Sequence, residues 1–235
     1  MRLQVHNHCM KFYKPGEKIL ELNCGTGTDA VFFAEHGLHV FATDIAGAML
    51  IELQKKIEAK HIEDKISVQQ CSFTDLHLLK EKHFNHIYSN FGGLNCAENI
   101  GAVISQFKSL LVPGGTVTLV IMPPVCPWEI FSALNGNFKT AFRRLKKNGT
   151  GSNVEGIHFK SWYYTPSQLE KYFGSSYKLL ALKGLAAFVP PPHHKNFPDK
   201  FPFLLRLLCR LDENFSGYFP FNRLADHIIL TMKAS

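Results

Sequence analysis

Residues 18–30 read KILELNCGTGTDA, the most informative stretch of this 235-residue chain. Its apolar start predicts a strand that ends on an acid, Glu21, and is followed by a turn before a helix opens. The turn contains Asn23, Gly25 and Gly27. Small residues in such a turn let the backbone lie close to a bound ligand. The stretch therefore predicts a ligand-binding loop after a buried strand.

A second stretch with related chemistry follows at residues 42–50, which read ATDIAGAML. It predicts the end of the next strand, and that strand ends on Asp44. An acid in this place accepts hydrogen bonds from the two hydroxyls of a ribose. Because the carboxyl ends of parallel strands meet at one edge of a sheet, the two stretches together predict a nucleoside-binding crevice.

This crevice resembles the cofactor site of class I S-adenosylmethionine-dependent methyltransferases, whose loop after the first strand runs acid-x-Gly-x-Gly-x-Gly. SNFGG at 89–93 and LLVPGG at 110–115 resemble further signatures of that family. The resemblance implies S-adenosyl-L-methionine as cofactor and S-adenosyl-L-homocysteine as product. It also implies that Glu21 holds the methionine amino group, directly or through water. The cofactor-binding residues that it implies are Glu21, Asn23, Gly25, Gly27, Asp44, Ile45, Ser72, Phe73 and Asn90.

Two positions depart from the pattern of the family. Asn23 replaces the first glycine and adds a side chain that faces the cofactor loop. Ser72 stands where such enzymes often place an acid that takes the adenine amino group. Adenine would then be held by backbone groups near Phe73 and by apolar walls. Asp75 is an alternative partner for adenine, although we favour a helix-capping role for it.

An NAD(P)-dependent oxidoreductase is a rival interpretation, because GTGTDA also satisfies the dinucleotide pattern G-x-G-x-x-A and Asp44 follows at a suitable distance. A pyrophosphate-binding turn would not favour an anion such as Glu21 at the end of the strand. The signatures at 89–93 and 110–115 also favour a methyltransferase. So does an expected antiparallel pair of strands near the C-terminus, which is absent from NAD domains.

Strand and helix patterns alternate through residue 122, which is typical of an α/β, doubly wound sheet. A sixth strand at YKLLALKGL and a last strand at HIILTMK complete a Rossmann-like sheet of seven strands with an antiparallel last strand. The other expected strands are 18–23, 38–43, 66–70, 84–89 and 116–122, and the expected core helices are 28–36, 47–60, 98–111 and PSQLEKYF.

Two insertions interrupt this pattern and are expected to form a cap. The first contains a predicted helix over 127–146 and a loop, and the second is rich in Pro and Phe. The resulting division is a cofactor-binding part at 1–122, a basic insertion at 123–160, a return to the sheet at 161–185, a second insertion at 186–226 and the last strand at 227–235. Many relatives carry a helix or two before the first strand, whereas the lead here is short, so we expect either a truncated N-terminus or a cap that covers the site instead.

The distribution of charge points to the cap as the place where the acceptor binds. Residues 1–122 hold 11 Lys and Arg against 12 Asp and Glu, whereas residues 123–226 hold 14 against 7. Lys139, Arg143 and Lys147 fall at helical spacing, which predicts a cationic stripe that attracts anions. The charge favours an anionic acceptor and the Pro- and Phe-rich second insertion a hydrophobic one, so the acceptor is expected to be a small molecule, anionic or hydrophobic.

Nucleic acid is a weaker expectation, because base-modifying relatives carry NPPY or DPPY after the fourth strand and this chain reads SNFGG. The candidate catalytic residues are Asn90, which would orient the acceptor, and Glu129, which would act as a base. His158 and His227 are further candidate bases. His193 and His194 lack partners at ligand spacing, so we predict no metal.

Composition agrees with a cytoplasmic protein of one enlarged domain. The six cysteines show no metal-ligand spacing, no apolar run is long enough to cross a bilayer, and the first residues lack the apolar segment of a signal peptide. The sequence thus predicts a small-molecule methyltransferase. The alternatives are an RNA or tRNA methyltransferase that uses the basic insertion, the oxidoreductase, and a catalytically silent S-adenosylmethionine-binding protein.

Overall fold

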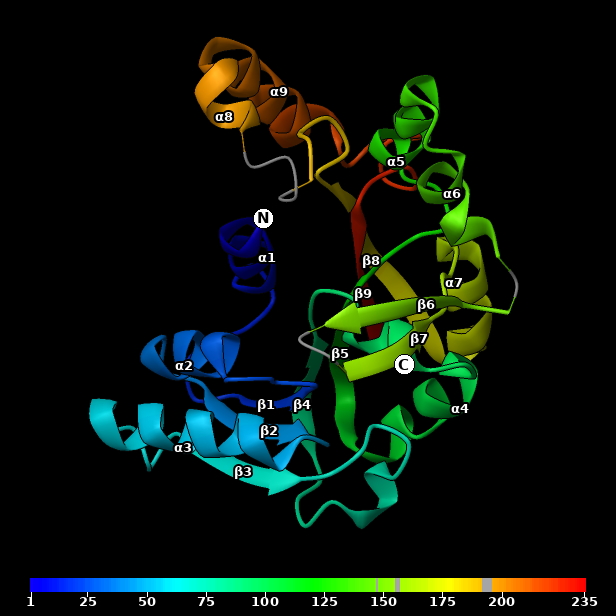
Figure 1. Ribbon diagram of the computed structural model, residues 1–235. Helices are drawn as coiled ribbons and strands as arrows, with labels where there is room; N and C mark the ends of the chain where they lie inside the picture. Colours follow the sequence, from blue (N-terminus) through cyan, green and yellow to red (C-terminus); the bar gives the residue numbers. More distant parts are fainter. Residues whose placement is uncertain (147, 155–156, 192–195) are drawn as a thin grey trace.

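The computed structural model describes residues 1–146, 148–154, 157–191 and 196–235. Its centre is a sheet of seven strands in the order β3-β2-β1-β4-β5-β9-β8 (Figure 1). The strands are β1 (Lys18–Leu22), β2 (His39–Asp44), β3 (Ile66–Gln70), β4 (Phe84–Ser89), β5 (Leu111–Ile121), β8 (Tyr177–Leu185) and β9 (His227–Ala234).

Strands β1 to β5 run parallel to one another, whereas β9 lies antiparallel between β5 and β8. The predicted Rossmann-like sheet of seven strands with an antiparallel end is therefore confirmed. The bounds expected for β1 to β4 agree with the structure to within one residue. Strand β5 begins at Leu111 rather than at residue 116, because its start pairs with Phe84 across an irregularity in the register.

Helices cover both faces of the sheet, as a doubly wound fold requires. The α-helices are α1 (Arg2–Cys9), α2 (Thr28–Glu35), α3 (Gly47–Lys60), α4 (Ile100–Ser105), α5 (Pro127–Phe131), α6 (Phe138–Ala141), α7 (Pro166–Phe173), α8 (Phe197–Lys200) and α9 (Pro202–Phe215). Short 3₁₀ segments are η1 (Leu76–Leu78), η2 (Gly93–Cys96), η3 (Phe107–Ser109), η4 (Ser132–Asn135), η5 (Arg143–Leu145) and η6 (Gly174–Ser176).

Two apolar clusters, one on each face, hold the sheet between its helices. Helices α1, α2 and α3 pack on one face, where Phe33, Leu53 and Ile57 are almost fully buried. Helices α4 and α7 pack on the other face (Figure 1). Burying one such side chain contributes about 1.5–3 kcal/mol. Gly27 lies where α2 meets α3, and a Cβ atom there would stand 2.2 Å from Leu53 Cδ1.

The register of the last strands places both insertions at one edge of the sheet. Ile121 at the end of β5 pairs with Ile228 at the start of β9, and Leu185 at the end of β8 pairs with His227. The segment between β5 and α7 and the segment between β8 and β9 therefore both leave from the carboxyl edge of the parallel strands. This edge is where an open α/β sheet binds its ligands.

The first insertion differs from the expectation of one helix over 127–146, which is wrong. The chain instead forms α5, η4, α6 and η5 in succession. Gly136 adopts φ 75° after η4, and Asn137 starts α6 by accepting the Thr140 backbone N–H at 3.2 Å. Both residue types favour helix ends, so the sequence divides this segment into short pieces. The cationic stripe predicted along a single helix therefore does not form, and Lys147 lies outside the described residues.

Four further elements, two helices and a pair of strands, complete the structure. Helix α1 precedes the sheet, and α9 forms the main body of the second insertion (Figure 1). Strands β6 (Thr150–Val154) and β7 (Ile157–Ser161) pair antiparallel as a separate two-stranded sheet. Within the described residues, the structure contains no helix with both the length and the apolar character that a transmembrane span requires.

Candidate functional site

A crevice opens at the carboxyl edge of the sheet between the loops that follow β1 and β4. Helix α1 contributes Arg2 to its wall. Of the residues predicted to bind the cofactor, the crevice is lined by Asn23, Gly25 and Asn90. Its remaining lining residues are Cys24, Thr26, Thr28, Asp29, Phe91 and Gly93.

Glu21 is a buried acid at the penultimate position of β1, and its Oε2 atom has no hydrogen-bond partner among the described residues. Burial, followed by the charge of Asp29, raises the pKa of the Glu21 carboxyl well above its usual range, although Arg2 acts in the opposite direction. A buried acceptor without a partner is costly. This oxygen is therefore suited to a ligand that brings a hydrogen-bond donor with positive charge.

Asp44 fixes the loop that forms the floor of the crevice. Its Oδ2 atom accepts the Gly25 backbone N–H at 2.8 Å, and its Oδ1 atom accepts the Ala46 N–H at 2.9 Å. Each carboxylate oxygen can accept a second hydrogen bond, so both remain able to accept from a ribose diol. Gly25 has φ 53°, and no atom lies within 4 Å of the position that a Cβ would take there. The loop thus leaves open space directly beside Asp44.

Asn23 occupies the place of the first glycine of the family pattern, and a second glycine accommodates it. A Cβ on Gly93 would lie 2.8 Å from the Asn23 Cβ atom, so only glycine fits opposite this side chain. The Asn23 Oδ1 atom accepts a hydrogen bond from the Ser89 hydroxyl at 3.3 Å. Asn23 therefore joins the loop after β1 to the end of β4.

Asp29 at the start of α2 connects three walls of the crevice. Its carboxylate pairs with Arg2, lies 2.7 Å from the His6 Nε2 atom, and accepts a hydrogen bond from the Asn90 Nδ2 atom at 2.7 Å. Burial would raise the pKa of Asp29, but the hydrogen bonds from these three residues outweigh burial and lower it. The Asn90 Oδ1 atom accepts the Phe91 N–H at 2.8 Å, so both ends of the Asn90 amide hold the wall of the crevice.

The remaining predicted cofactor residues lie along the neighbouring strand ends. Ile45 is 65% exposed although it is apolar, and it follows Asp44 directly. Ser72 bonds the Thr74 hydroxyl at 2.7 Å, and Phe73 packs partly against the core. The side chain of Asp75 makes no capping hydrogen bond at η1, so the capping role that we favoured for it is wrong.

Glu129 belongs to a buried ion network rather than to the open crevice. The Arg143 Nε atom bonds its Oε2 atom at 2.7 Å, and the Arg144 Nη2 atom bonds its Oε1 atom at 2.6 Å. Arg144 also bonds the Asp226 Oδ1 atom at 2.7 Å. Burial would raise the pKa of Glu129, but both arginines outweigh burial and lower it. These contacts argue against the role of a base that we predicted for Glu129.

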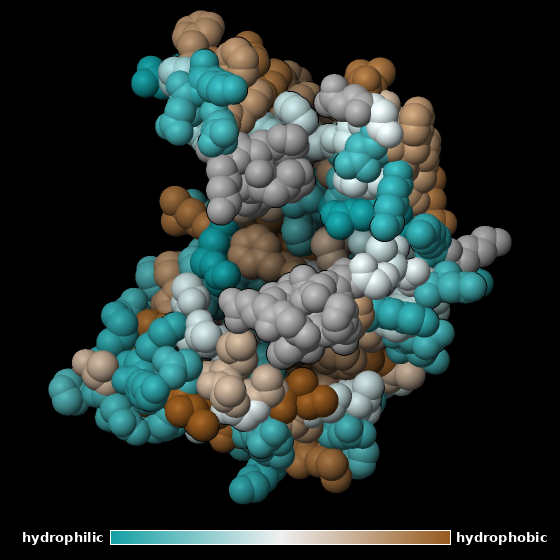
Figure 2. All heavy atoms as spheres, viewed as in Figure 1, coloured by the Kyte–Doolittle hydropathy of each residue, from teal (hydrophilic) through white to brown (hydrophobic). Residues whose placement is uncertain are grey.

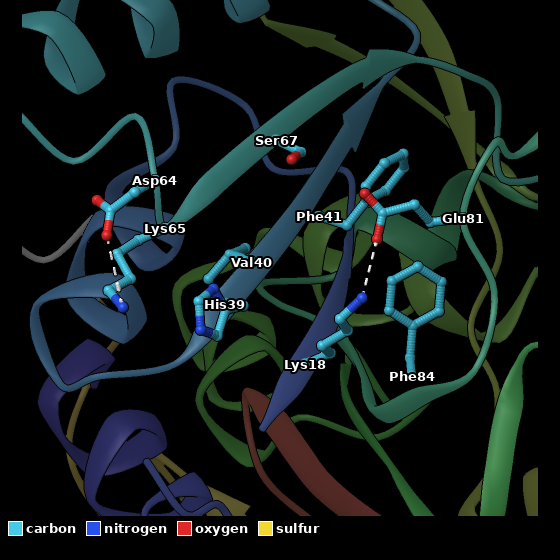
Figure 3. A pocket seen from close by; sticks show the side chains of 9 residues that line it. All are labelled: Lys18, His39, Val40, Phe41, Asp64, Lys65, Ser67, Glu81 and Phe84. Carbon is cyan, nitrogen blue, oxygen red and sulfur yellow. Dashed lines mark hydrogen bonds and ion pairs between the residues drawn. The ribbon is translucent and has the colours of Figure 1, made fainter. Parts of the chain in front are cut away.

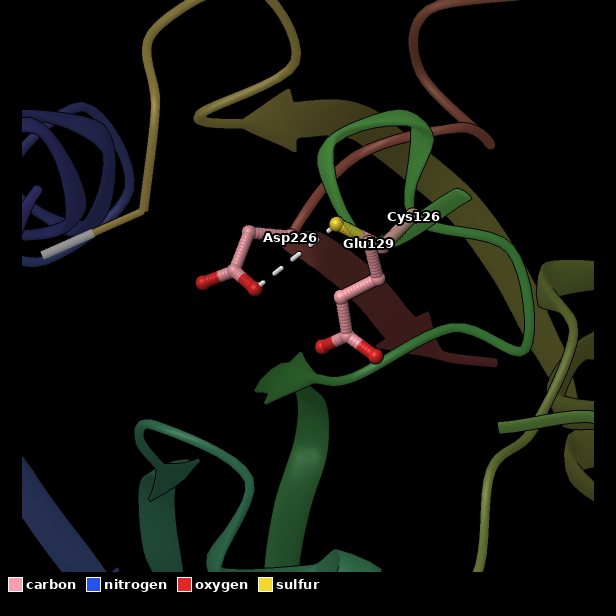
Figure 4. A group of neighbouring side chains, drawn as sticks. All are labelled: Cys126, Glu129 and Asp226. Carbon is pink, nitrogen blue, oxygen red and sulfur yellow. Dashed lines mark hydrogen bonds between the residues drawn. The ribbon is translucent and has the colours of Figure 1, made fainter. Parts of the chain in front are cut away.

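The same network contains a group that resembles a metal site in composition. Potential ligand atoms of Cys126, Glu129 and Asp226 lie within 4.8 Å of one another, as Figure 4 shows. The Arg144 guanidinium bonds both carboxylates and supplies the positive charge that a metal ion would bring. We therefore interpret this group as an ion network. His193 and His194 lie outside the described residues, as does the side chain of His158.

His227 is the candidate base that the structure brings next to the crevice. It begins β9, its Nδ1 atom lies 2.9 Å from the Asp226 Oδ2 atom, and its ring packs edge-on against Phe91 with centroids 5.8 Å apart. Phe91 lines the crevice. Burial would raise the pKa of Asp226, but the bonds and charges of His227 and Arg144 lower it to about 2. Asp226 thus remains an anion that holds the imidazole in place.

A second pocket lies at the opposite edge of the sheet. Its lining includes Lys18, His39 and Phe84 at the starts of three strands, as Figure 3 shows. Lys18 and Glu81 form an ion pair of 3.5 Å across it. Because the glycine-containing loops lie at the carboxyl edge, this pocket is separate from the predicted cofactor site.

Comparison with known proteins agrees with this description of the crevice. A family model described as a methyltransferase domain matches residues 19–115, which span β1 to the start of β5. The chain is 25% identical over 146 residues to a protein of Beutenbergia cavernae named demethylmenaquinone methyltransferase, covering 62% of this chain and 57% of that protein. The chain spans about half the length of the relatives that it matches in sequence.

Solved structures show the same fold over the whole chain. An S-adenosylmethionine-dependent methyltransferase of Mesorhizobium loti has a TM-score of 0.62 at 15% identity, covering 97% of this chain and 96% of that one. A 1,6-didemethyltoxoflavin-N1-methyltransferase of Burkholderia thailandensis, solved with 1,6-didemethyltoxoflavin and S-adenosylhomocysteine, has a TM-score of 0.58 at 15% identity, covering 99% and 76%.

The fold and the strand-end crevice define a Rossmann-like nucleoside-binding protein. Residues 19–115 match the methyltransferase-domain family, and the whole chain has the fold of solved S-adenosylmethionine-dependent methyltransferases. The predicted family, fold and cofactor class are thereby confirmed. The oxidoreductase alternative loses its support, because the antiparallel strands β9 and β8 follow β5 in the sheet.

Proposed function

We propose that this protein transfers a methyl group from S-adenosylmethionine to a small-molecule acceptor. The observation that carries the proposal is the unpartnered Oε2 atom of Glu21 near the end of β1, because the glycine-containing loop that follows this strand lines the crevice. S-adenosylmethionine carries its transferable methyl group on a positively charged sulfur, and it also brings an α-ammonium group. These donors and charges fit the buried acid and the open backbone at Gly25.

The proposed cofactor contacts follow the strand ends. Glu21 would accept hydrogen bonds from the ammonium group, and Asp44 would accept them from the ribose hydroxyls. The exposed side chain of Ile45 would lie against the adenine, with Ser72 and Phe73 beside it. Asn90 would keep the wall in place through Asp29. Alignment of acceptor, methyl and sulfur, with exclusion of water, supplies most of the catalysis in such a displacement.

We further propose that His227 removes a proton from the acceptor. A neutral imidazole accepts a proton at its Nε2 atom when Nδ1–H is held by a carboxylate, and Asp226 stands 2.9 Å from Nδ1. A base is needed only when the acceptor carries a proton at neutral pH, as a phenol or an alcohol does. The acceptor that this arrangement suits is therefore a small molecule with a hydroxyl group.

The inserted segments favour an apolar acceptor over an anionic one. Arg143 and Arg144 are engaged with Glu129 and Asp226, so their charges are balanced within the protein. Two relatives are named for demethylmenaquinone and 1,6-didemethyltoxoflavin, which are small molecules, whereas one solved structure of the same fold is named for rRNA. We therefore place a hydrophobic, hydroxyl-bearing molecule ahead of RNA as the acceptor.

Ligand binding and label transfer together test this function. Calorimetric titration with S-adenosylhomocysteine, NADH and NADPH should give binding with the first only. Methyl-labelled S-adenosylmethionine should then label a panel of hydroquinones and phenols, and should leave tRNA unlabelled. Binding of NADH alone, or label in tRNA alone, would contradict the proposal. Binding of S-adenosylhomocysteine without label in any acceptor would support the silent binding protein instead.

Removing the Asp44 carboxylate is expected to weaken cofactor binding strongly. Asp44→Ala loses charge-assisted hydrogen bonds to the ribose, on the order of 2–3 kcal/mol. S-adenosylhomocysteine affinity measured by calorimetry should therefore fall by about 30- to 150-fold. Asp64→Ala is a matched control, because Asp64 is an exposed acid that pairs with Lys65 at 3.6 Å away from the crevice. Equal affinities for the two variants would contradict the role of Asp44.

Cofactor binding is expected to release a proton from Glu21. Burial and the charge of Asp29 raise the pKa of Glu21, so the free protein keeps this proton to a higher pH than an ordinary carboxyl does. An ammonium ligand favours the ionised form, so binding should strengthen as the pH rises. Calorimetry of S-adenosylhomocysteine in buffers of different ionisation enthalpy measures the released proton. Glu21→Gln should abolish this release and weaken binding by about tenfold or more. Proton release that persists in the variant would assign it to another group.

A further inference from the structure

Most of the exposed large apolar side chains of this protein lie in two short stretches of the insertions. The strand and helix core contributes few by comparison. The first stretch, at 130–145, contains Ile130, Phe131, Leu134, Phe138, Phe142 and Leu145. The second, at 201–219, contains Phe201, Phe203, Leu204, Leu207, Phe215, Tyr218 and Phe219. We call these two stretches the apolar cap.

Helix α9 has an apolar face that no described part of the chain covers. Phe203 is 81% exposed and Leu207 is 47% exposed on this face, and the exposed Arg206 and Arg210 lie beside them. The opposite side of the helix is anchored, because the Asp212 carboxylate accepts the backbone N–H groups of three consecutive residues after β8. The helix is thus held firmly to the sheet while its apolar face points outward.

The other half of the apolar cap is anchored in the same manner. Arg144 ties the first stretch to Glu129 and Asp226, whereas Leu134 is 84% exposed. Lys139 and Lys146 are exposed within or next to this stretch. Both stretches leave from the carboxyl edge of the sheet and lie at one end of the molecule (Figure 1). Figure 2 shows brown apolar residues at that end with teal hydrophilic residues between them.

We propose that the apolar cap docks on the surface of a lipid bilayer that contains anionic headgroups. Helices with aromatic and aliphatic residues on one face and Arg or Lys beside them lie in the interface of a bilayer. Arg and Lys residues near an anionic membrane surface add electrostatic attraction. Residues 123–226 carry 14 Lys and Arg against 7 Asp and Glu. A second copy of this chain would bring the same positive charge and be repelled, whereas an anionic bilayer complements it.

Co-sedimentation with vesicles tests this inference without any assay of activity. The wild-type protein should bind vesicles of phosphatidylcholine mixed with phosphatidylglycerol at least tenfold more tightly than vesicles of phosphatidylcholine alone. Added salt should narrow this difference, because it screens exposed charges. Phe203→Glu with Leu207→Glu should weaken binding to the mixed vesicles by more than tenfold. Arg206→Glu with Arg210→Glu should remove the preference for the anionic lipid.

A double variant on the core serves as the matched control. Ile51 and Leu78 are 59% and 62% exposed on α3 and η1, so Ile51→Glu with Leu78→Glu makes the same chemical change outside the cap. This variant should bind within twofold of the wild type, and thermal melting should show that all variants fold. Wild-type protein that stays in the supernatant would overturn the proposal. Equal losses of vesicle binding in both apolar double variants would also overturn it. So would light scattering that shows a wild-type dimer, if Phe203→Glu with Leu207→Glu dissociates that dimer.

Discussion

His227→Ala is expected to lower kcat by about 10²–10⁴-fold, the range in which positioned proton transfer contributes to catalysis. The imidazole lies between the Asp226 carboxylate and the ring of Phe91, which lines the crevice. Its removal should leave S-adenosylhomocysteine affinity within about threefold of the wild type, a difference of less than 1 kcal/mol. Single-turnover transfer of labelled methyl, together with calorimetry, separates the two effects.

The protein supplies its own control for this substitution. His86 is also buried and paired with a carboxylate, with its Nε2 atom 2.8 Å from a Glu17 oxygen, but it lies at the amino edge of the sheet. His86→Ala should therefore lower stability and leave kcat nearly unchanged. Added imidazole should restore part of the activity of His227→Ala only. An unchanged kcat in His227→Ala would mean that the acceptor needs no base.

The sequence alone provides no reason to prefer His227 to the other histidines as the candidate base. A lone histidine at the start of a strand is most often a packed residue, and the significance of this one depends on Phe91, which is far away along the chain. The pairing of β9 with β5 brings them together. The same holds for Arg2, because its partner Asp29 belongs to another helix and α1 has a weakly amphipathic sequence. Such contacts exist only after the sheet has formed.

The parts that the sequence did predict are those controlled by local chemistry. Buried parallel strands read as apolar runs, and each acid that marks a strand end, Glu21 and Asp44, is followed by residues that favour a turn. The helix expected over 127–146 does not form as one piece, because Gly136 and Asn137 interrupt it. Asn137 is a residue that starts helices, and Gly136 ends them. Composition also placed the excess of positive charge in the region of the insertions. Part of this charge is balanced by the ion pairs of Arg143 and Arg144 with Glu129 and Asp226.

Arg144 is expected to contribute most to the stability of the cap. Its guanidinium is 3% exposed and bonds two buried carboxylates, Glu129 at 2.6 Å and Asp226 at 2.7 Å, as well as the Asp226 carbonyl at 2.8 Å. Arg144→Met would leave both acids buried without this partner, which costs about 3–5 kcal/mol. For a chain of this size the melting temperature should fall by roughly 6–20 °C, measured by thermal unfolding at neutral pH.

Two further variants distinguish this network from an ordinary ion pair. Arg143 also bonds Glu129, but its side chain is 40% exposed, so Arg143→Met should cost less than about 1 kcal/mol. Adding Glu129→Gln to Arg144→Met should recover part of the loss, because it removes a buried charge that only the half-exposed Arg143 would still balance. The lowered pKa of Asp226 stabilises the fold above pH ~4, and this stabilisation is lost as the pH falls towards 2. Arg144→Met should weaken that acid dependence. If Arg143→Met and Arg144→Met lowered the melting temperature equally, burial would not be the reason that Arg144 matters.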